Sequence, residues 1–185
     1  MTELDLFGAE PKISRAIGGH HSNTGGNDEW LTPPWVIESL GPFDLDPCSP
    51  VNRPWPTAQA HMTLEDDGLG SPWPDDARVW CNPPYAHVWK WLAKLAAHGN
   101  GVALIFARTE TKGFREQVWE KADGLLFLHK RLSFHYVDGT EAKANSGAPS
   151  VLVAYGESNV SALEKACLPG ALVYGWDFTG WGDAA

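Results

Sequence analysis

One four-residue motif has the residue types and spacing needed to hold a planar amine. It is Asn82-Pro83-Pro84-Tyr85. It directly follows Val79-Trp80-Cys81, which has the composition of a buried strand. The prolines fix their φ angles, and each favours extended backbone in the residue before it. The Asn82 side chain and a nearby carbonyl can accept hydrogen bonds from an NH2 group, while Tyr85 offers a face for a flat ring. The motif therefore predicts a site that holds an exocyclic amine during attack on an electrophile.

Two acidic motifs upstream predict a ligand site beside this one. Phe43-Asp44-Leu45-Asp46-Pro47 reads as a strand stopped by proline, and Glu65-Asp66-Asp67-Gly68-Leu69 follows a second short strand expected over 61–64. Carboxylates accept hydrogen bonds from ribose hydroxyls, an ammonium and an adenine amine. Because ligands bind outside the carboxyl ends of strands in open α/β sheets, we expect the Asp46 and Asn82 elements to share one edge.

Three further apolar runs predict the rest of the sheet, at 102–107, 125–128 and 151–155. The first run is unbroken, as expected for a central parallel strand covered on both faces. Short buried strands that alternate with helices are typical of an α/β fold. We therefore expect an open, mostly parallel sheet.

A helix is predicted directly after the Asn-Pro-Pro-Tyr motif. Apolar residues there follow the i, i+3, i+4, i+7, i+8 spacing of an amphipathic helix, and Gly99 suits its C-terminal end. These residues are Val88, Trp91, Leu92, Leu95 and Ala96. Two more helices are expected, over 32–38 with Thr32 as the N-cap, and over 114–121.

The composition is that of one soluble globular domain. The chain has 185 residues, of which 43% are hydrophobic and 20% charged. Residues 1–27 are rich in Gly and polar residues and are expected to form a flexible N-terminal segment. Residues 28–185 are then expected to form a single domain without a separate target-recognition domain.

Membrane, secretory and metal-binding classes are disfavoured. No apolar stretch approaches the ~20 residues of a membrane span, and the first ten residues lack the apolar core of a signal peptide. The three cysteines form no C-x-x-C pair and the seven histidines show no metal spacing, so we expect no metal site. A cytoplasmic location fits such cysteine usage best.

The net charge and the distribution of charge give different indications about nucleic-acid binding. The net charge of −9 disfavours general nucleic-acid binding, yet half of the fourteen Lys and Arg residues lie within 108–143. Four of these are candidate phosphate contacts, although solvated surface positions remain the alternative. They are Arg108, Lys112, Lys130 and Arg131.

From about residue 28 to residue 155, the ordered motifs resemble those of the phage-type, or Dam-like, DNA N6-adenine methyltransferases. The resemblance implies a Rossmann-like methyltransferase fold, S-adenosylmethionine as cofactor and adenine in DNA as substrate. The motifs that carry it are Asp28-Glu29-Trp30-Leu31-Thr32-Pro33, Leu45-Asp46-Pro47-Cys48, Thr63-Leu64-Glu65-Asp66-Asp67-Gly68-Leu69, Cys81-Asn82-Pro83-Pro84-Tyr85, Ala107-Arg108-Thr109-Glu110-Thr111 and Lys130-Arg131-Leu132-Ser133-Phe134.

The same resemblance assigns residue roles. The motif from Asn82 to Tyr85 would hold the target base. Of the acidic residues, Asp67 is favoured for the adenine of the cofactor, and Glu65 or Asp66 for its ribose. The other residues that would border the cofactor, with Asp46 near its methionine or ribose part, are Trp30, Thr32, Pro33, Asp46, Pro47 and Cys48.

The chain departs from broader adenine methyltransferases at the cofactor side. The usual Gly-rich loop after the first strand is replaced by Cys48-Ser49-Pro50-Val51-Asn52-Arg53-Pro54. The short separation of Asp46 from Asn82 leaves no room for the usual succession of strand-helix units. We therefore expect a compressed version of the methyltransferase fold.

The predicted function is methylation of the N6 amine of adenine in DNA, with relaxed sequence specificity and a phage or prophage origin. Sequence readout would come from loops 108–115 and 132–149, and a purpose would be protection of DNA in a restriction-modification setting. Duplex and single-stranded DNA both remain open as substrates. One alternative is methylation of a protein glutamine, because such enzymes share the motif and the acidic charge suits it. Another is a vestigial core that acts as a binding module.

Overall fold

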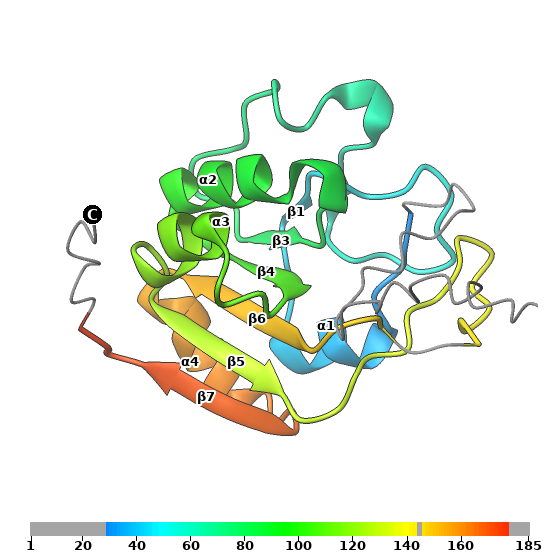
Figure 1. Cartoon of the computed structure of the whole chain (residues 1–185). Coiled ribbons are helices and arrows are strands. Elements are labelled where there is room, and N and C mark those ends of the chain that lie inside the picture. The colour runs from blue at the N-terminus through cyan, green and yellow to red at the C-terminus, as the bar shows by residue number, and fades with distance from the viewer. Residues whose placement is uncertain (1–28, 144–145, 178–185) are drawn as a thin grey trace, which may run out of the picture.

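A seven-stranded sheet with helices on both faces makes up the protein, as the computed structural model describes it for residues 29–143 and 146–177 (Figure 1). The strand order is β2-β1-β3-β4-β6-β5-β7. The strands are β1 (Leu45–Asp46), β2 (Ala60–His61), β3 (Val79–Cys81), β4 (Gly101–Phe106), β5 (Gly124–Leu128), β6 (Ser150–Tyr155) and β7 (Gly170–Tyr174). The segment 1–27, expected to be flexible, lies outside the described residues, and a single domain over 28–185 stays a prediction.

The sheet is mixed, so the prediction of a mostly parallel sheet was wrong. Strands β2, β1, β3 and β4 are parallel to one another, but β6 is antiparallel to both β4 and β5, and β7 is antiparallel to β5. The longest ladders are the antiparallel ones. An apolar run indicates burial but not direction, and β6 begins at the edge where β5 ends, so it must run back.

Helices cover the two faces of the sheet separately. Figure 1 shows α2 and α3 on one face, and α1 and α4 on the other. The helices are α1 (Pro34–Leu40), α2 (Val88–His98), α3 (Lys112–Phe114), which continues as a π-helix (Arg115–Trp119), and α4 (Glu157–Lys165). Within the described ranges, no helix is long and apolar enough to cross a membrane.

Helix α2 confirms the amphipathic pattern read from the sequence. Val88, Trp91, Leu92 and Leu95 are buried, and Gly99 ends the helix with a φ of +75°. A residue with positive φ at this position lets the chain leave the helix axis. The Gly99 N–H still donates to the Leu95 carbonyl in the last turn of the helix. Helix α2 therefore packs its apolar side on β3 and β4, and the Asn-Pro-Pro-Tyr motif lies directly before it.

Two other helix predictions need correction. Helix α1 begins at Pro34 with Pro33 in the N-cap position and no side-chain cap, so Thr32 does not cap it. The segment predicted as one helix over 114–121 is a short α-helix followed by a π-helix. Helix α4 and strand β7 have no counterpart among the elements predicted from the sequence. Between β1 and β3 the chain forms only β2 and a short 3-10 turn at Leu64–Asp66. The strand predicted over 61–64 was therefore wrong in its bounds, because residue 64 already belongs to the turn that Thr63 caps.

Candidate active site

The site lies where the carboxyl ends of β1 and β3 meet. From β1 the chain continues to β2 on one side and later to β3 on the other, so the strand order reverses at β1. In open α/β sheets, ligands bind at such a reversal point, outside the carboxyl ends of the strands. Asp46 ends β1 and Asn82 directly follows β3, so the expectation that these two elements share an edge is confirmed.

Asn82 is held by a backbone group from a distant segment. Its Nδ2 donates a hydrogen bond to the carbonyl oxygen of Trp30, at 3.0 Å. This bond uses one N–H of the side-chain amide, so the amide oxygen Oδ1 takes no part in it. The contact brings the Trp30-Leu31-Thr32-Pro33 motif against the Asn-Pro-Pro-Tyr motif.

Tyr85 lies at the start of the 3-10 turn Tyr85–His87, which precedes α2. One face of its ring stacks on Phe106 at the end of β4, with ring centroids 4.4 Å apart and an interplanar angle of 25°. The side chain nevertheless remains 45% exposed. An aromatic ring that is supported on one side and exposed on the other can stack a further flat ring.

Asp46 is a buried carboxylate. It is 4% exposed and accepts hydrogen bonds from the Thr57 hydroxyl and, at 3.1 Å, from the Cys48 backbone N–H. Burial raises the pKa of this carboxyl to about 6, and the two hydrogen bonds offset part of the rise. A buried carboxylate with a raised pKa favours a bound cation or further hydrogen-bond donors.

Two thiols join the ends of the same strands. The sulfur atoms of Cys48 and Cys81 lie 3.7 Å apart, and both cysteines are free. The hydrogen bond to Cys81, together with burial, raises the pKa of the Cys48 thiol well above its usual value. A thiol held protonated is a poor nucleophile, so this pair acts as packing between the two strand ends.

The acidic motif at 65–67 lies against the end of β1. A Cβ atom on Gly68 would come within 2.0 Å of the Pro47 carbonyl oxygen, so the two backbones are in direct contact. The Lys94 ammonium donates to the carbonyl oxygens of Gly68, Leu69 and Ser71, at 2.9, 3.0 and 2.5 Å. Helix α2 therefore fixes this loop beside Pro47 and Cys48.

Two of the three carboxylates in this motif already accept hydrogen bonds from residues of the same loop. Asp66 accepts from the Thr63 N–H and hydroxyl, at 2.7 and 2.9 Å, and these bonds lower its pKa. Asp67 has a φ of +44° and accepts from the Gly70 N–H at 3.2 Å. All three side chains are exposed, Glu65 included.

The motif at 30–33 is tied to a short hairpin over 134–142. Leu31 exchanges two backbone hydrogen bonds with His135, of 2.9 and 3.0 Å, and the Trp30 ring contacts the Tyr136 ring at 5.2 Å. Thr32 is 1% exposed, and its hydroxyl finds no hydrogen-bond partner among the residues that the structure describes. Pro33 is also buried.

The site thus gathers four segments that are separate in the sequence. A family model for DNA N-6-adenine-methyltransferase (Dam) matches residues 19–163 of the chain. The chain belongs to this family. Searches among curated proteins and among solved structures found no significant match. Membership in the Dam family makes DNA adenine methylation the reaction class and DNA the substrate.

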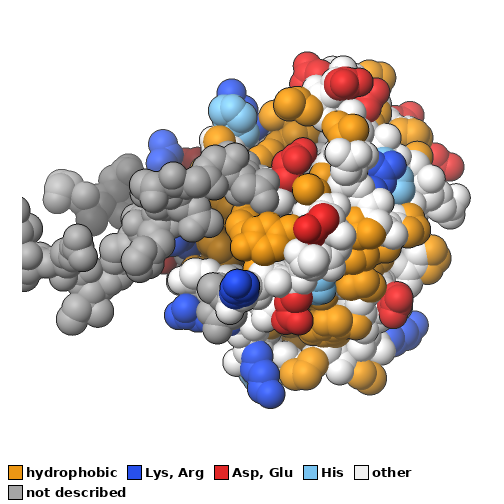
Figure 2. Space-filling model, turned by 90° about the vertical axis from the view of Figure 1, so that its right-hand side faces the viewer, with side chains coloured by type: hydrophobic (Ala, Val, Ile, Leu, Met, Phe, Trp, Pro, Cys, Tyr) orange, Lys and Arg blue, Asp and Glu red, His pale blue; other side chains and the backbone are white. Residues whose placement is uncertain are grey.

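The four cationic DNA-contact candidates of this Dam-family chain lie on the same edge of the sheet. Arg108 and Lys112 follow β4, while Lys130 and Arg131 follow β5, which runs in the same direction. Lys112 is strongly exposed and pairs with Glu116 at 3.6 Å. Figure 2 shows this edge, where hydrophobic side chains extend across the middle, acidic side chains are scattered among them, and most Lys and Arg side chains lie toward the periphery.

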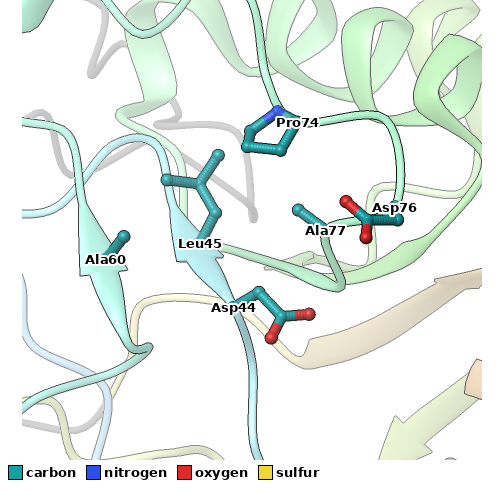
Figure 3. Close-up of a pocket in the computed structure, with 6 residues that line it drawn as sticks. All are labelled: Asp44, Leu45, Ala60, Pro74, Asp76 and Ala77. Carbon is teal, nitrogen blue, oxygen red and sulfur yellow. The ribbon is translucent and has the colours of Figure 1, made fainter.

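A cavity of about 250 Å³ lies away from this site. Figure 3 shows Asp44, Leu45 and Ala60 from the starts of β1 and β2, facing Pro74, Asp76 and Ala77 from the segment before β3. These are the amino-terminal ends of the parallel strands, opposite to Asn82. The hollow is therefore not part of the candidate active site.

Several residues of the site could not be found from the sequence. Thr57, Lys94 and Phe106 support Asp46, the acidic loop and Tyr85 respectively, but each resembles an ordinary loop, helix or strand residue. Gly68, by contrast, belongs to the acidic motif, and a glycine after two aspartates does indicate a turn or a close backbone approach.

The Gly68 contact generates a stability prediction. Gly68→Ala should lower the free energy of unfolding by about 1–3 kcal/mol, because the added methyl group would displace the acidic loop from Pro47. Gly147→Ala is the matched control, since a Cβ there meets no atom of the described residues within 4 Å. Thermal unfolding of both variants measures the difference, and equal midpoints would show that the two backbones are not in contact.

Proposed function

We propose that the chain transfers a methyl group from S-adenosylmethionine to the N6 amine of adenine in DNA, with Asn82-Pro83-Pro84-Tyr85 as the catalytic motif. The observation that carries the proposal is the orientation of Asn82. Its Nδ2 is bonded to the Trp30 carbonyl, which leaves Oδ1 as the acceptor for an amine. Family membership supplies the reaction class, and the proposal adds the cofactor and the residue roles.

The adenine amine is a poor nucleophile because its lone pair is delocalised into the ring. Hydrogen bonds from the amine to Asn82 Oδ1 and to the Pro83 carbonyl would favour a tetrahedral nitrogen with a localised lone pair. No strong base is needed, so positioning and electrostatics supply most of the rate.

The target adenine must leave the base stack to reach this motif, at a cost of a few kcal/mol in a duplex. Stacking on Tyr85 would return about 1–3 kcal/mol. The support of the Tyr85 ring by Phe106 favours this role, because a ring already packed on one face loses little freedom when a base stacks on the other. Single-stranded DNA would avoid the unpairing cost.

The residues around β1 fit the proposed cofactor. The Asp46 carboxylate, buried with a raised pKa, suits an ammonium or ribose hydroxyls. The Thr32 hydroxyl, which has no hydrogen-bond partner in the described part of the chain, suits a polar group of the ligand. S-adenosylmethionine would supply an electrophilic methyl group. Trp30, Pro33, Pro47 and Cys48 would border it.

The acidic loop would bind the nucleoside part of the cofactor. Because Asp66 accepts two hydrogen bonds from Thr63, we favour Glu65 for the ribose hydroxyls. Asp67, whose Oδ1 accepts from the Gly70 N–H, would use its other oxygen for the adenine amine. The fold proposed to present these groups is a compressed Rossmann-like methyltransferase fold. The parallel strands β2-β1-β3-β4 with a reversal at β1 support it.

We further propose relaxed sequence specificity, with phosphate contacts from Arg108, Lys112, Lys130 and Arg131. The readout elements are segment 108–115 and the 132–149 loop that contains the hairpin, since the described residues form one sheet with its helices and connections. A phage or prophage origin, and protection of DNA from restriction, are consistent with such relaxed methylation.

Transfer of a tritiated methyl group tests the proposal directly. The wild-type chain should label DNA and leave glutamine-containing protein unlabelled. Asn82→Ala should bind S-adenosylmethionine normally, because His135 and Trp55 still hold the 30–33 segment, but it should lower kcat about 10²–10³-fold, because it removes the acceptor for the reacting amine. Labelling of protein in place of DNA would favour a glutamine methyltransferase. Unchanged turnover in Asn82→Ala would refute the catalytic role.

The raised pKa of Asp46 generates a prediction for cofactor binding. The ionised carboxylate is the form that attracts an ammonium or hydroxyl donors, and it becomes protonated as the pH falls below about 6. Affinity for S-adenosylmethionine should therefore be constant above this pH and fall about tenfold at pH 5. Calorimetry across this range measures it. Asp46→Asn should remove the dependence, and a wild-type affinity that is flat with pH would contradict the contact.

A further inference from the structure

We propose that the Trp30 backbone carbonyl fixes the orientation of the Asn82 amide, so that an ionised aspartate cannot replace asparagine at position 82. This inference deepens the proposed function and rests on it. It assigns to Trp30 a positioning role through its backbone, separate from the cofactor contact proposed for the residue.

The partner of Asn82 determines which way the amide faces. A carbonyl oxygen can only accept a hydrogen bond, so the group that points to it at 3.0 Å must be the NH2. The amide oxygen is then directed away from Trp30. Rotation of the amide by 180° would place two oxygen atoms against each other and leave the Trp30 carbonyl without this donor.

The Trp30 carbonyl is itself firmly held. The next residue, Leu31, is 2% exposed and bonds to His135 through both its N–H and its carbonyl. The Thr32 carbonyl accepts from the Trp55 indole N–H at 3.2 Å. The Trp30 ring also packs against Tyr136. Because three contacts fix this short segment, it cannot easily shift to accommodate a different side chain at position 82.

Hydrogen bonds between the two strands of the 134–142 hairpin strengthen its support of the Trp30 segment. The Ala142 N–H donates to the Phe134 carbonyl at 2.8 Å, and the Tyr136 N–H donates to the Thr140 carbonyl at 2.9 Å. These bonds close a two-stranded hairpin, to which Leu31 adds through its bridge with His135. The 134–142 hairpin therefore helps to position the catalytic asparagine.

An aspartate at position 82 would meet this carbonyl with a charged oxygen. A carboxylate has no donor, so the contact becomes repulsive and the side chain should turn away from the position that holds the amine. A protonated carboxyl can donate to Trp30 and present its other oxygen to the amine. The variant Asn82→Asp should therefore be active only in its protonated form.

Other titratable groups lie in the segments that meet near position 82 and would also respond to pH. They come from the 29–33 segment, the β1 and β3 ends, the β4 end and the hairpin. These groups are Glu29, Asp46, Cys48, Cys81, Tyr85, Arg108, His135 and Tyr136. All of them are present in both wild type and variant, so the ratio of variant to wild-type turnover isolates the contribution of position 82.

The experiment measures methyl transfer to DNA by wild type and Asn82→Asp between about pH 5.5 and pH 8.5. At the upper limit the variant should be at least about 10²-fold slower, because only its small protonated fraction is active. The ratio of turnover should rise at least about tenfold as the pH falls. A ratio that does not change with pH, or a variant as fast as wild type at high pH, would overturn the inference.

The matched control is Asn100→Asp. Asn100 also donates its Nδ2 to backbone carbonyls, those of Asp76 and Ala77 at 3.3 Å each, but it lies at the opposite end of the sheet. The same substitution there should leave the pH profile of turnover parallel to wild type. A profile that rises at low pH in both variants would indicate a general effect of the added charge, and would contradict a specific role of Trp30.

A second measurement on the wild-type protein keeps the inference testable if Asn82→Asp does not fold. In nitrogen-15 NMR, the side-chain NH2 of Asn82 should exchange with solvent more slowly than that of the exposed Asn52. Equal exchange rates would contradict the bond to Trp30. If wild type transfers no methyl group to DNA, the proposed function fails, while this exchange measurement still decides the orientation of Asn82.

Discussion

The parallel pairing of β1 with β3 is the interaction on which the rest of the site depends. Leu45 of β1 pairs with Val79 of β3, so both strands end at the same edge of the sheet. The Cys48–Cys81 sulfur contact, the Gly68 backbone against Pro47 and the bond from Asn82 to Trp30 then fasten the neighbouring segments to this edge. A two-residue strand is thereby sufficient to organise a site built from loops.

Electrostatics divide this edge between two kinds of ligand. Carboxylates gather at the β1 end, where Asp46 is buried and the acidic loop packs against Pro47. Cationic side chains follow β4 and β5 on the other side of Asn82. In the proposed function the first group attracts a cofactor with ammonium and hydroxyl donors, and the second attracts phosphates. An acidic chain can in this way bind DNA through a local cationic region.

The motifs could be predicted because each consists of consecutive residues whose types indicate the chemistry. The placement of Asp46 and Asn82 at strand ends followed from short apolar runs stopped by polar residues and proline. The direction of β6 could not be predicted, since burial on both faces produces the same apolar run in either direction. Thr32 was misread because its buried hydroxyl lies before the helix that it was expected to cap. The hairpin at 134–142 has a local turn signal in Asp138-Gly139, where Gly139 has a φ of +86°, but its pairing with Leu31 is a long-range contact that the local sequence does not show.

The central claim is that the oriented Asn82 amide serves methylation of adenine in DNA. Single-molecule sequencing of DNA from cells that express the chain tests it most directly, because it reports both the modified base and its sequence context. We predict N6-methyladenine in many sequence contexts, absent from cells that carry an empty vector. DNA without added N6-methyladenine, from cells in which the folded protein is present, would contradict the account.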